Sequence, residues 1–219
     1  MDYRRITLIA GHYGSGKTNI AVNMAFDLKK NFDNVAIADL DIVNPYFRTK
    51  DSIDELTESG IRLICSEYAN TNVDIPALPQ DMYSVIDDKS LMAVVDIGGD
   101  DRGAYALGRY ADGILSEGNY DMLFVINCFR PLTKTADDVI EVMHEIETAG
   151  KIKFTGIINN SNLGEETTAE DVLSSFDYAK QVSEKTGLPV VMTCADAKIC
   201  DGLENVENLF PLSLQKKII

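Results

Sequence analysis

The residues best suited to do chemistry form a short glycine-rich segment near the start of the chain. It reads Gly11-His12-Tyr13-Gly14-Ser15-Gly16-Lys17-Thr18, a complete G-x4-G-K-[ST] motif that follows an apolar run and precedes an amphipathic stretch. Its glycines allow consecutive backbone N–H groups to turn around phosphate oxygens, and a helix N-terminus adds partial positive charge. An incidental Lys-Thr after a glycine-rich turn is the alternative. The order of strand, loop and helix favours a nucleotide site.

Two side chains of this motif have distinct expected roles. Lys17 is predicted to reach the β- and γ-phosphates and to act in catalysis, and Thr18 is predicted to place its hydroxyl on Mg²⁺. The predicted nucleotide-binding residues of the loop and the adjoining helix are Gly11, His12, Tyr13, Gly14, Ser15, Gly16, Lys17, Thr18 and Asn19.

Carboxylates follow two further apolar runs. Asp39 and Asp41 come directly after the second predicted strand, on the same side of it because side chains alternate along a strand. Asp96 ends the fourth, in the segment Asp96-Ile97-Gly98-Gly99. Buried carboxylates are unfavourable unless they hold a metal, a donor or a water. We therefore expect Asp39, Asp96 and Thr18 to serve Mg²⁺, and Gly99 to offer its N–H to a γ-phosphate. A solvated loop and a simple Gly-Gly turn are the alternatives.

These motifs together resemble the ParA and MinD class of ATPases, which also includes the nitrogenase iron protein and the arsenical-pump and tail-anchored-protein ATPases. The resemblance extends from the first predicted strand to Asp196. It implies that Asp41 helps to position the attacking water and that Asp96 is the Walker B aspartate.

The resemblance also implies a site for the base. Gly156-Ile157-Ile158-Asn159-Asn160-Ser161 is similar to the strand of the iron protein that ends in Asn-Ser, which assigns Asn160 to adenine. Thr193-Cys194-Ala195-Asp196 stands where family members carry a Pro-x-Asp loop near the adenine, which implies a contact from Asp196. An ordinary loop accounts equally well for this last segment.

The chain departs from the family at His12. The family carries a second lysine there, which reaches across a nucleotide-sandwiched dimer to the partner's phosphates. Imidazole is shorter and mostly neutral at pH 7, so it supplies no permanent charge. We therefore expect slow intrinsic turnover. Arg48, Arg102 and Arg130 are candidates to replace the lysine, although surface or packing roles account for each of them better.

The elements that must position these residues alternate between short apolar runs and longer amphipathic stretches, which predicts βαβ units. One helix is predicted to end at Gly150, which would supply a left-handed cap, and another to run from Thr168 to near Gly187. The predicted strands are Arg5–Ala10, Val35–Ala38, Ile61–Cys65, Leu91–Val95, Met122–Asn127, Lys153–Ile158 and Val190–Thr193.

No repeat or linker divides the sequence. We predict one doubly wound α/β P-loop domain over residues 1–219, with a mostly parallel sheet of about seven strands and helices on both faces.

Composition narrows the partners. The 20 Lys and Arg against 35 Asp and Glu give a net charge of −15, which disfavours sequence-independent binding to nucleic acid or to an anionic membrane. The apolar runs are far shorter than the roughly 20 residues that a membrane-spanning helix needs. The run before Gly11 is too short for a signal-peptide core, so a cytoplasmic location is expected.

Three functions remain open. The leading one is a slow, Mg-dependent ATPase that acts as a switch through an unknown protein partner or a nucleotide-dependent homodimer. Tyr46 and Phe47, which follow Asp41, are candidates for a switch segment or a partner surface, although core packing accounts for them at least as well. ATP is favoured over GTP because the sequence has no Asn-Lys-x-Asp motif. An ATP-dependent amidoligase or small-molecule kinase of the same fold ranks second. A scaffold that binds nucleoid or membrane ranks third, because residues 212–219 are too few for a convincing amphipathic anchor.

Overall fold

The computed structural model of the chain describes residues 3–41, 50–65, 80–99 and 101–213, with the backbone alone at 50–53, 80, 101 and 102. Its strands form one parallel sheet in the order β3-β2-β4-β1-β5-β6-β7-β8. The strands are β1 (Ile6–Ala10), β2 (Val35–Asp39), β3 (Arg62–Ile64), β4 (Met92–Asp96), β5 (Tyr120–Ile126), β6 (Gly156–Asn159), β7 (Val190–Asp196) and β8 (Leu209–Leu212).

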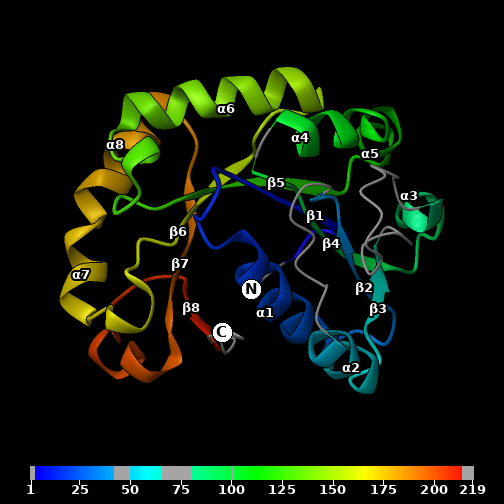
Figure 1. Cartoon of the computed structure of the whole chain (residues 1–219), viewed down its shortest axis with the longest axis horizontal. Coiled ribbons are helices and arrows are strands. Elements are labelled where there is room, and N and C mark those ends of the chain that lie inside the picture. Colours follow the sequence, from blue (N-terminus) through cyan, green and yellow to red (C-terminus); the bar gives the residue numbers. More distant parts are fainter. Residues whose placement is uncertain (1–2, 42–49, 66–79, 100, 214–219) are drawn as a thin grey trace.

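Helices cover both faces of this sheet. They are α1 (Lys17–Lys29), α2 (Lys50–Glu58), α3 (Tyr83–Asp87), α4 (Asp101–Gly108), α5 (Ala111–Glu117), α6 (Ala136–Gly150), α7 (Ala169–Ser174) and α8 (Phe176–Thr186). Figure 1 shows α4, α5 and α6 along one face and α1 and α2 on the other. The predicted doubly wound α/β architecture, mostly parallel and of about seven strands, is therefore confirmed.

The eighth strand was not predicted. β8 pairs in parallel with β7, and Pro211 lies within it. Proline lacks a backbone N–H, so it is tolerated in a strand at the edge of a sheet but not in the middle. A four-residue run containing proline gives almost no strand signal in the sequence.

Two details of the helices differ from prediction. The single helix expected from Thr168 to Gly187 is two helices, α7 and α8, joined at Ser175. The left-handed cap of α6 is Lys151, with φ of 58°, rather than Gly150. Gly150 instead packs closely against α4, where a Cβ would lie 3.1 Å from Leu107 Cδ2.

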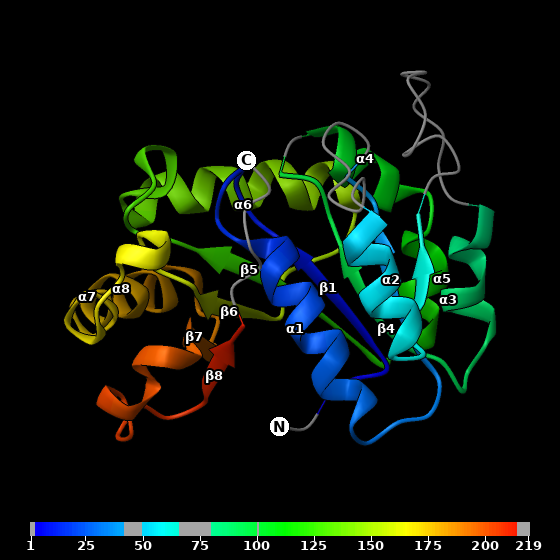
Figure 2. The same ribbon diagram turned by 60° about the horizontal axis from the view of Figure 1, so that its bottom comes forward.

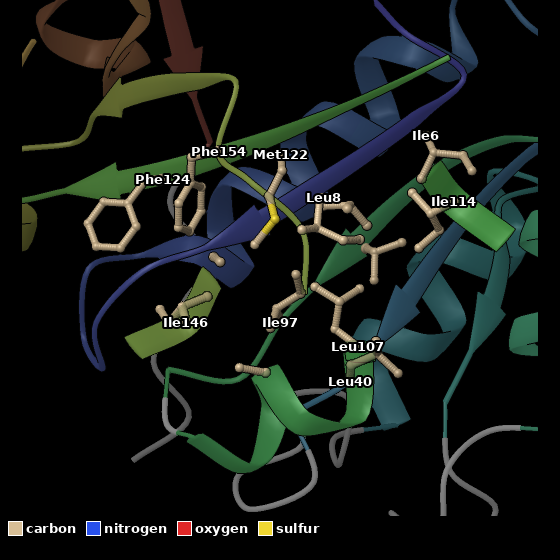
Figure 3. Packing of buried hydrophobic residues seen from close by; sticks show 14 of the residues in the cluster. Ile6, Leu8, Leu40, Ile97, Leu107, Ile114, Met122, Phe124, Ile146 and Phe154 are labelled. Atoms are coloured by element: carbon tan, nitrogen blue, oxygen red, sulfur yellow. The ribbon is translucent and has the colours of Figure 1, made fainter. Parts of the chain in front are cut away.

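The core consists of two layers of apolar side chains, one on each face of the sheet, because successive residues of a strand point to opposite faces. In Figure 3, Leu8 of β1 and Met122 and Phe124 of β5 face Leu107 of α4 and Ile146 of α6. The opposite face of the sheet packs against α1, which crosses in front of β1 in Figure 2. Burying each such side chain contributes about 1.5–3 kcal/mol. With both faces covered, β1 and its neighbours β4 and β5 form a rigid base for the loops that follow them.

A charged network holds the amino-terminal end of the sheet. The Arg5 guanidinium is buried and donates to the carbonyl oxygens of Val85 (2.8 Å), Asp88 (3.1 Å) and Leu91 (3.1 Å), in the segment that enters β4. It also pairs with Glu117 at the end of α5, and Lys89 pairs with the same carboxylate. These hydrogen bonds from Arg5 and Lys89 lower the pKa of Glu117 from 4.5 to about 2.

This pKa predicts a pH-dependent contribution to stability. A carboxylate whose pKa is lower in the folded state stabilises the fold above its unfolded pKa, and this stabilisation is lost as pH falls through the folded value. Glu117→Gln should lower the melting temperature by about a few degrees at pH 7. The difference in melting temperature between Glu117→Gln and wild type should disappear as the pH falls from 4.5 to about 2. Calorimetric melting across this range measures it, with exposed Glu184→Gln as control; a gap independent of pH would contradict the prediction.

Candidate functional site

The glycine-rich segment forms a compact loop between β1 and α1. Gly16 is the N-cap of α1 and has φ of 91°, a left-handed conformation that side chains other than glycine rarely adopt. A Cβ at Gly16 would lie only 2.3 Å from Asn160 Nδ2, so close approach also requires glycine here. The loop is closed by a hydrogen bond from Ser15 N to His12 O at 3.2 Å.

Lys17 and His12 meet inside this loop. The Lys17 side chain is buried, and its Nζ donates to the carbonyl oxygen of His12 at 3.2 Å. His12 Nδ1 lies 3.0 Å from the carbonyl oxygen of Tyr13, an acceptor that favours the Nδ1–H tautomer. The loop thus brings an ammonium group, backbone N–H groups and the positive end of α1 to one place, which is the arrangement that binds phosphate.

Carboxylates of β2 and β4 lie beside this loop. Asp39 and Asp96 are partners in the β2–β4 register, so the two carboxylates sit side by side at the end of the sheet. Thr18 Oγ1 donates to Asp96 Oδ2 at 2.6 Å, which joins α1 to β4. Asp39 Oδ1 accepts a hydrogen bond from Asp41 N at 2.9 Å, which fixes the start of the segment that carries Asp41.

The pKa of Asp96 is raised by its surroundings. Its side chain is fully buried, and Oδ1 finds no hydrogen-bond partner within the described parts of the chain. Burial raises the pKa of Asp96 from 3.8 to about 6, and the nearby Asp41 adds to this, while Lys17 and the hydrogen bond from Thr18 oppose it. A buried carboxylate oxygen with unused acceptor capacity fits a cation or a metal-bound water.

The donor set matches Mg²⁺ held together with a nucleotide. In the regions described, no group of three or more His, Cys, Asp and Glu side chains could hold a metal ion. Mg²⁺ commonly takes one or two protein oxygens and completes its shell with phosphates and water. Thr18 and Asp96 supply such oxygens next to a phosphate-binding loop.

Gly99 lies directly over the loop. A Cβ there would be 2.6 Å from Tyr13 N and 2.9 Å from Lys17 Nζ, so no larger residue fits. The turn after β4 therefore packs on the loop after β1. This proximity is compatible with the predicted role of the Gly99 N–H at a terminal phosphate.

Asn160 holds the other side of the loop. It follows β6, is buried, and its Nδ2 donates to the carbonyl oxygen of Ser15 at 2.7 Å. Its backbone N donates to Ile126 O at 2.9 Å, which ties it to the end of β5. The amide group thus contacts the loop itself, while its predicted contact with adenine stays a prediction.

Sequence reasoning missed a buried polar network behind Asn160. Asn159 accepts from Ser161 Oγ at 2.8 Å and donates to Ser175 Oγ at 2.8 Å. Asn127, at the end of β5, donates to Asn162 O at 3.2 Å and accepts from Asn162 N. The network links the turns after β5 and β6. Its signal was present, because polar residues follow each of these apolar strands directly.

The remaining predicted residues have diverse surroundings. Asn19 lies on α1, where its Oδ1 accepts from Asn23 Nδ2 at 2.9 Å. Asp196 ends β7, and its Oδ1 accepts from Lys198 N at 3.0 Å as the cap of a 3-10 helix, Ala197–Gly202. The Arg130 side chain lies beside Gly14. Tyr46, Phe47 and Arg48 lie outside the described residues, and the side chain of Arg102 lies outside the described side chains.

Comparisons with known proteins agree with this geometry. A family model described as the CobQ/CobB/MinD/ParA nucleotide binding domain matches residues 6–186. No curated protein matches the chain in sequence.

Solved structures share the fold. FtsY from Mycoplasma mycoides has 18% sequence identity and a TM-score of 0.53, and the match covers 88% of this chain and 62% of that one. FtsY from Thermotoga maritima has 16% identity and a TM-score of 0.56, covering 87% and 61%. FtsY from Elizabethkingia anophelis has 14% identity and a TM-score of 0.52, covering 88% and 59%. The chain spans less than two thirds of these FtsY chains, and identities this low show the fold alone.

In the described ranges, no helix has both the length and the apolar character needed to cross a membrane.

The raised pKa of Asp96 predicts that Asp96→Asn stabilises the nucleotide-free protein but weakens nucleotide binding. An acid with a raised folded pKa is charged more readily when unfolded, so the free energy of unfolding falls as pH rises from 3.8 to about 6. Asp96→Asn should therefore raise the melting temperature of the nucleotide-free protein by about a few degrees at pH 7.5, with little gain near pH 4. It should also weaken Mg-dependent nucleotide binding.

Melting with and without Mg²⁺ and nucleotide measures both effects. Asp112→Asn, on the exposed surface of α5, is the matched control. A nucleotide-free Asp96→Asn protein that melts below wild type at pH 7.5 would show that the buried charge is not destabilising.

Proposed function

Because the chain belongs to the CobQ/CobB/MinD/ParA nucleotide-binding domain family, we propose that it binds Mg·ATP, hydrolyses it slowly and acts as a nucleotide-dependent switch. The observation that carries this proposal is the Thr18–Asp96 pair, which lies at the junction of the phosphate loop and β4 with a buried Asp96 oxygen free to accept. This pair is what a magnesium nucleotide requires of a protein. In this proposal the nucleotide state controls binding to a protein partner or to a second copy of the chain.

Binding begins with the loop and with Lys17. The Lys17 ammonium contacts the loop carbonyl of His12, and it reaches a bound phosphate by leaving that carbonyl. Thr18 and Asp96 are placed to hold Mg²⁺, directly or through water, and Asp39 lies next to them. The bound Mg²⁺ supplies positive charge that offsets the phosphates. Gly99, in the turn after β4, lies close to Tyr13 and Lys17 and is the proposed N–H donor to the terminal phosphate.

Asp41 is the proposed catalytic carboxylate. Its backbone is fixed by Asp39, and its Oδ1 lies 3.3 Å from the position that a Cβ on Gly98 would take. Asp41 is therefore held between the ends of β2 and β4, beside the Asp96 carboxylate that its charge influences. From there it accepts a proton from a water and orients that water toward the terminal phosphate.

We propose adenine as the base. The turn after β6 carries Asn159-Asn160-Ser161-Asn162, and the whole chain lacks the guanine-reading Asn-Lys-x-Asp motif. FtsY from Elizabethkingia anophelis has also been solved in complex with GDP, at 14% identity to this chain. Direct comparison of the two nucleotides therefore forms part of the binding test.

Calorimetric titration tests the binding half of this proposal. Wild-type protein should bind Mg·ATP more tightly than Mg·GTP, and Lys17→Ala should weaken Mg·ATP binding by about 2–3 kcal/mol, the scale of a lost charge-assisted contact to phosphate. Lys180→Ala, an exposed cation on α8, is the matched control. Unchanged affinity in Lys17→Ala would refute the phosphate-loop assignment, and tighter binding of GTP would refute the choice of base.

Single-turnover hydrolysis tests the catalytic half. Asp41→Ala should bind Mg·ATP within a few-fold of wild type but hydrolyse it about 10²-fold more slowly, the usual scale for losing a positioned base. Wild type should reach its ATP-bound association state or partner complex only with a non-hydrolysable ATP analogue. Light scattering should find Asp41→Ala in that same state with ATP itself. Asp112→Ala is the control.

Two outcomes would change the proposal. Normal turnover by Asp41→Ala would exclude its role in positioning water. Turnover that requires an added small-molecule acceptor would point instead to an ATP-dependent biosynthetic enzyme.

A further inference from the structure

The side chains around the phosphate loop carry more negative than positive charge, so a second cation there would favour the binding of a phosphate chain. Among residues 11–18 only Lys17 carries a permanent positive charge. Three carboxylates, Asp39, Asp41 and Asp96, stand close to it at the ends of β2 and β4. A nucleotide adds several more negative charges, and the whole chain has a net charge of −15. Binding of a polyanion against this field is favoured by any further cation held at the loop.

Arg130 provides such a cation. It lies in the turn after β5, and β5 is the direct neighbour of β1 in the sheet. Its guanidinium packs against the loop at Gly14, where a Cβ would be 3.6 Å from both Cζ and Nε and 3.9 Å from Nη1. The side chain is exposed, and among the residues that the structure describes it makes no ion pair or hydrogen bond. Its donors are thus available to a ligand in the loop.

The backbone that carries Arg130 is held firmly. Arg130 N donates to Asn127 O at 3.1 Å, and Arg130 O accepts from Thr133 N at 3.2 Å. Asn127 is fully buried, and its side-chain oxygen accepts from Phe129 N at 3.0 Å. The neighbouring Cys128 N donates to Ser161 Oγ, in the turn after β6, at 3.2 Å. The buried network behind Asn160 therefore also anchors the turn of Arg130, so its backbone needs little further ordering when the guanidinium binds.

We propose that Arg130 binds the phosphate chain of the nucleotide from the β5 side of the loop, within the same chain. This inference rests on the proposed nucleotide binding and adds a specific ligand contact to it. A guanidinium presents several N–H donors in a plane, which suits phosphate oxygens.

The sheet order indicates which part of the nucleotide Arg130 serves. Asp96 ends β4 and Gly99 follows it, on one side of β1, whereas Arg130 follows β5, on the other. The groups assigned to Mg²⁺ and to the terminal phosphate, Asp96 and Gly99, are thus on the side away from Arg130. Its contact falls on phosphates that ATP and ADP share, so it strengthens the binding of both nucleotides and leaves the rate of the chemical step nearly unchanged.

The test compares Mg·ATP and Mg·ADP affinity by calorimetry in wild type, Arg130→Gln, Arg130→Lys and a control, Lys134→Gln. Lys134 is an exposed cation four residues along the same segment, so its loss matches the change in overall charge. Arg130→Gln should weaken both nucleotides by roughly tenfold, Arg130→Lys by less, and Lys134→Gln by less than twofold. Single-turnover hydrolysis at saturating ATP should stay within about twofold of wild type in all three variants.

The outcomes separate this inference from the function on which it rests. If wild type binds neither nucleotide, the proposed function and the Arg130 contact both fail. If Lys17→Ala abolishes binding while Arg130→Gln matches Lys134→Gln, the loop assignment stands and the Arg130 contact is wrong. A loss confined to ATP, or a slower chemical step with unchanged affinity, would place Arg130 at the terminal phosphate and overturn the assignment to the shared phosphates.

Discussion

The hydrogen bond between Thr18 and Asp96 joins the two halves of the site. Thr18 is the last residue of the loop motif and lies in the first turn of α1, and Asp96 ends β4. This one contact therefore fixes the helix against the strand that lies between β1 and β2. It also keeps a carboxylate in an apolar interior, where burial raises its pKa. Under the proposed function, a bound cation would relieve this unfavourable buried charge. Stability and ligand binding would then be opposed at Asp96, as is common at functional sites.

The phosphate loop is held from two sides, by the packing of a glycine on one and by a polar network on the other. On the β4 side, Gly99 packs against Tyr13 and Lys17 without room for a side chain. On the β6 side, the Asn160 amide binds the loop carbonyl of Ser15, and Asn127 and Asn159 support it from behind. These contacts come from turns that follow separate strands, so the shape of the loop depends on the strand order and not only on its own glycines. A loop held in this way is preorganised for its ligand.

Motifs that are contiguous in the sequence could be predicted, and contacts made by strand order could not. The loop from Gly11 to Thr18 and the carboxylate of Asp96 each follow an apolar run, so local pattern was enough to propose their roles. The placement of Arg130 beside Gly14 needed the knowledge that β5 lies next to β1, because 116 positions separate the two residues. The break at Ser175 and the cap at Lys151 were also missed. Ser175 Oγ accepts from Asn159 Nδ2, and Gly150 lies close to Leu107; local sequence shows neither contact. The roles of Asn160 and Asp196 toward a base stay predictions.

The edges of the sheet bear on how copies of this chain could meet. An exposed edge strand offers unpaired N–H and C=O groups, which can recruit a strand from another molecule and lead to aggregation. In the part of the chain that the structure describes, one edge is β3, of three residues, and the other is β8, in which Pro211 has no N–H to donate. Both edges are poor templates for continuing the sheet into a neighbour. Strand addition at these two edges is thus a disfavoured way for copies of this chain to associate.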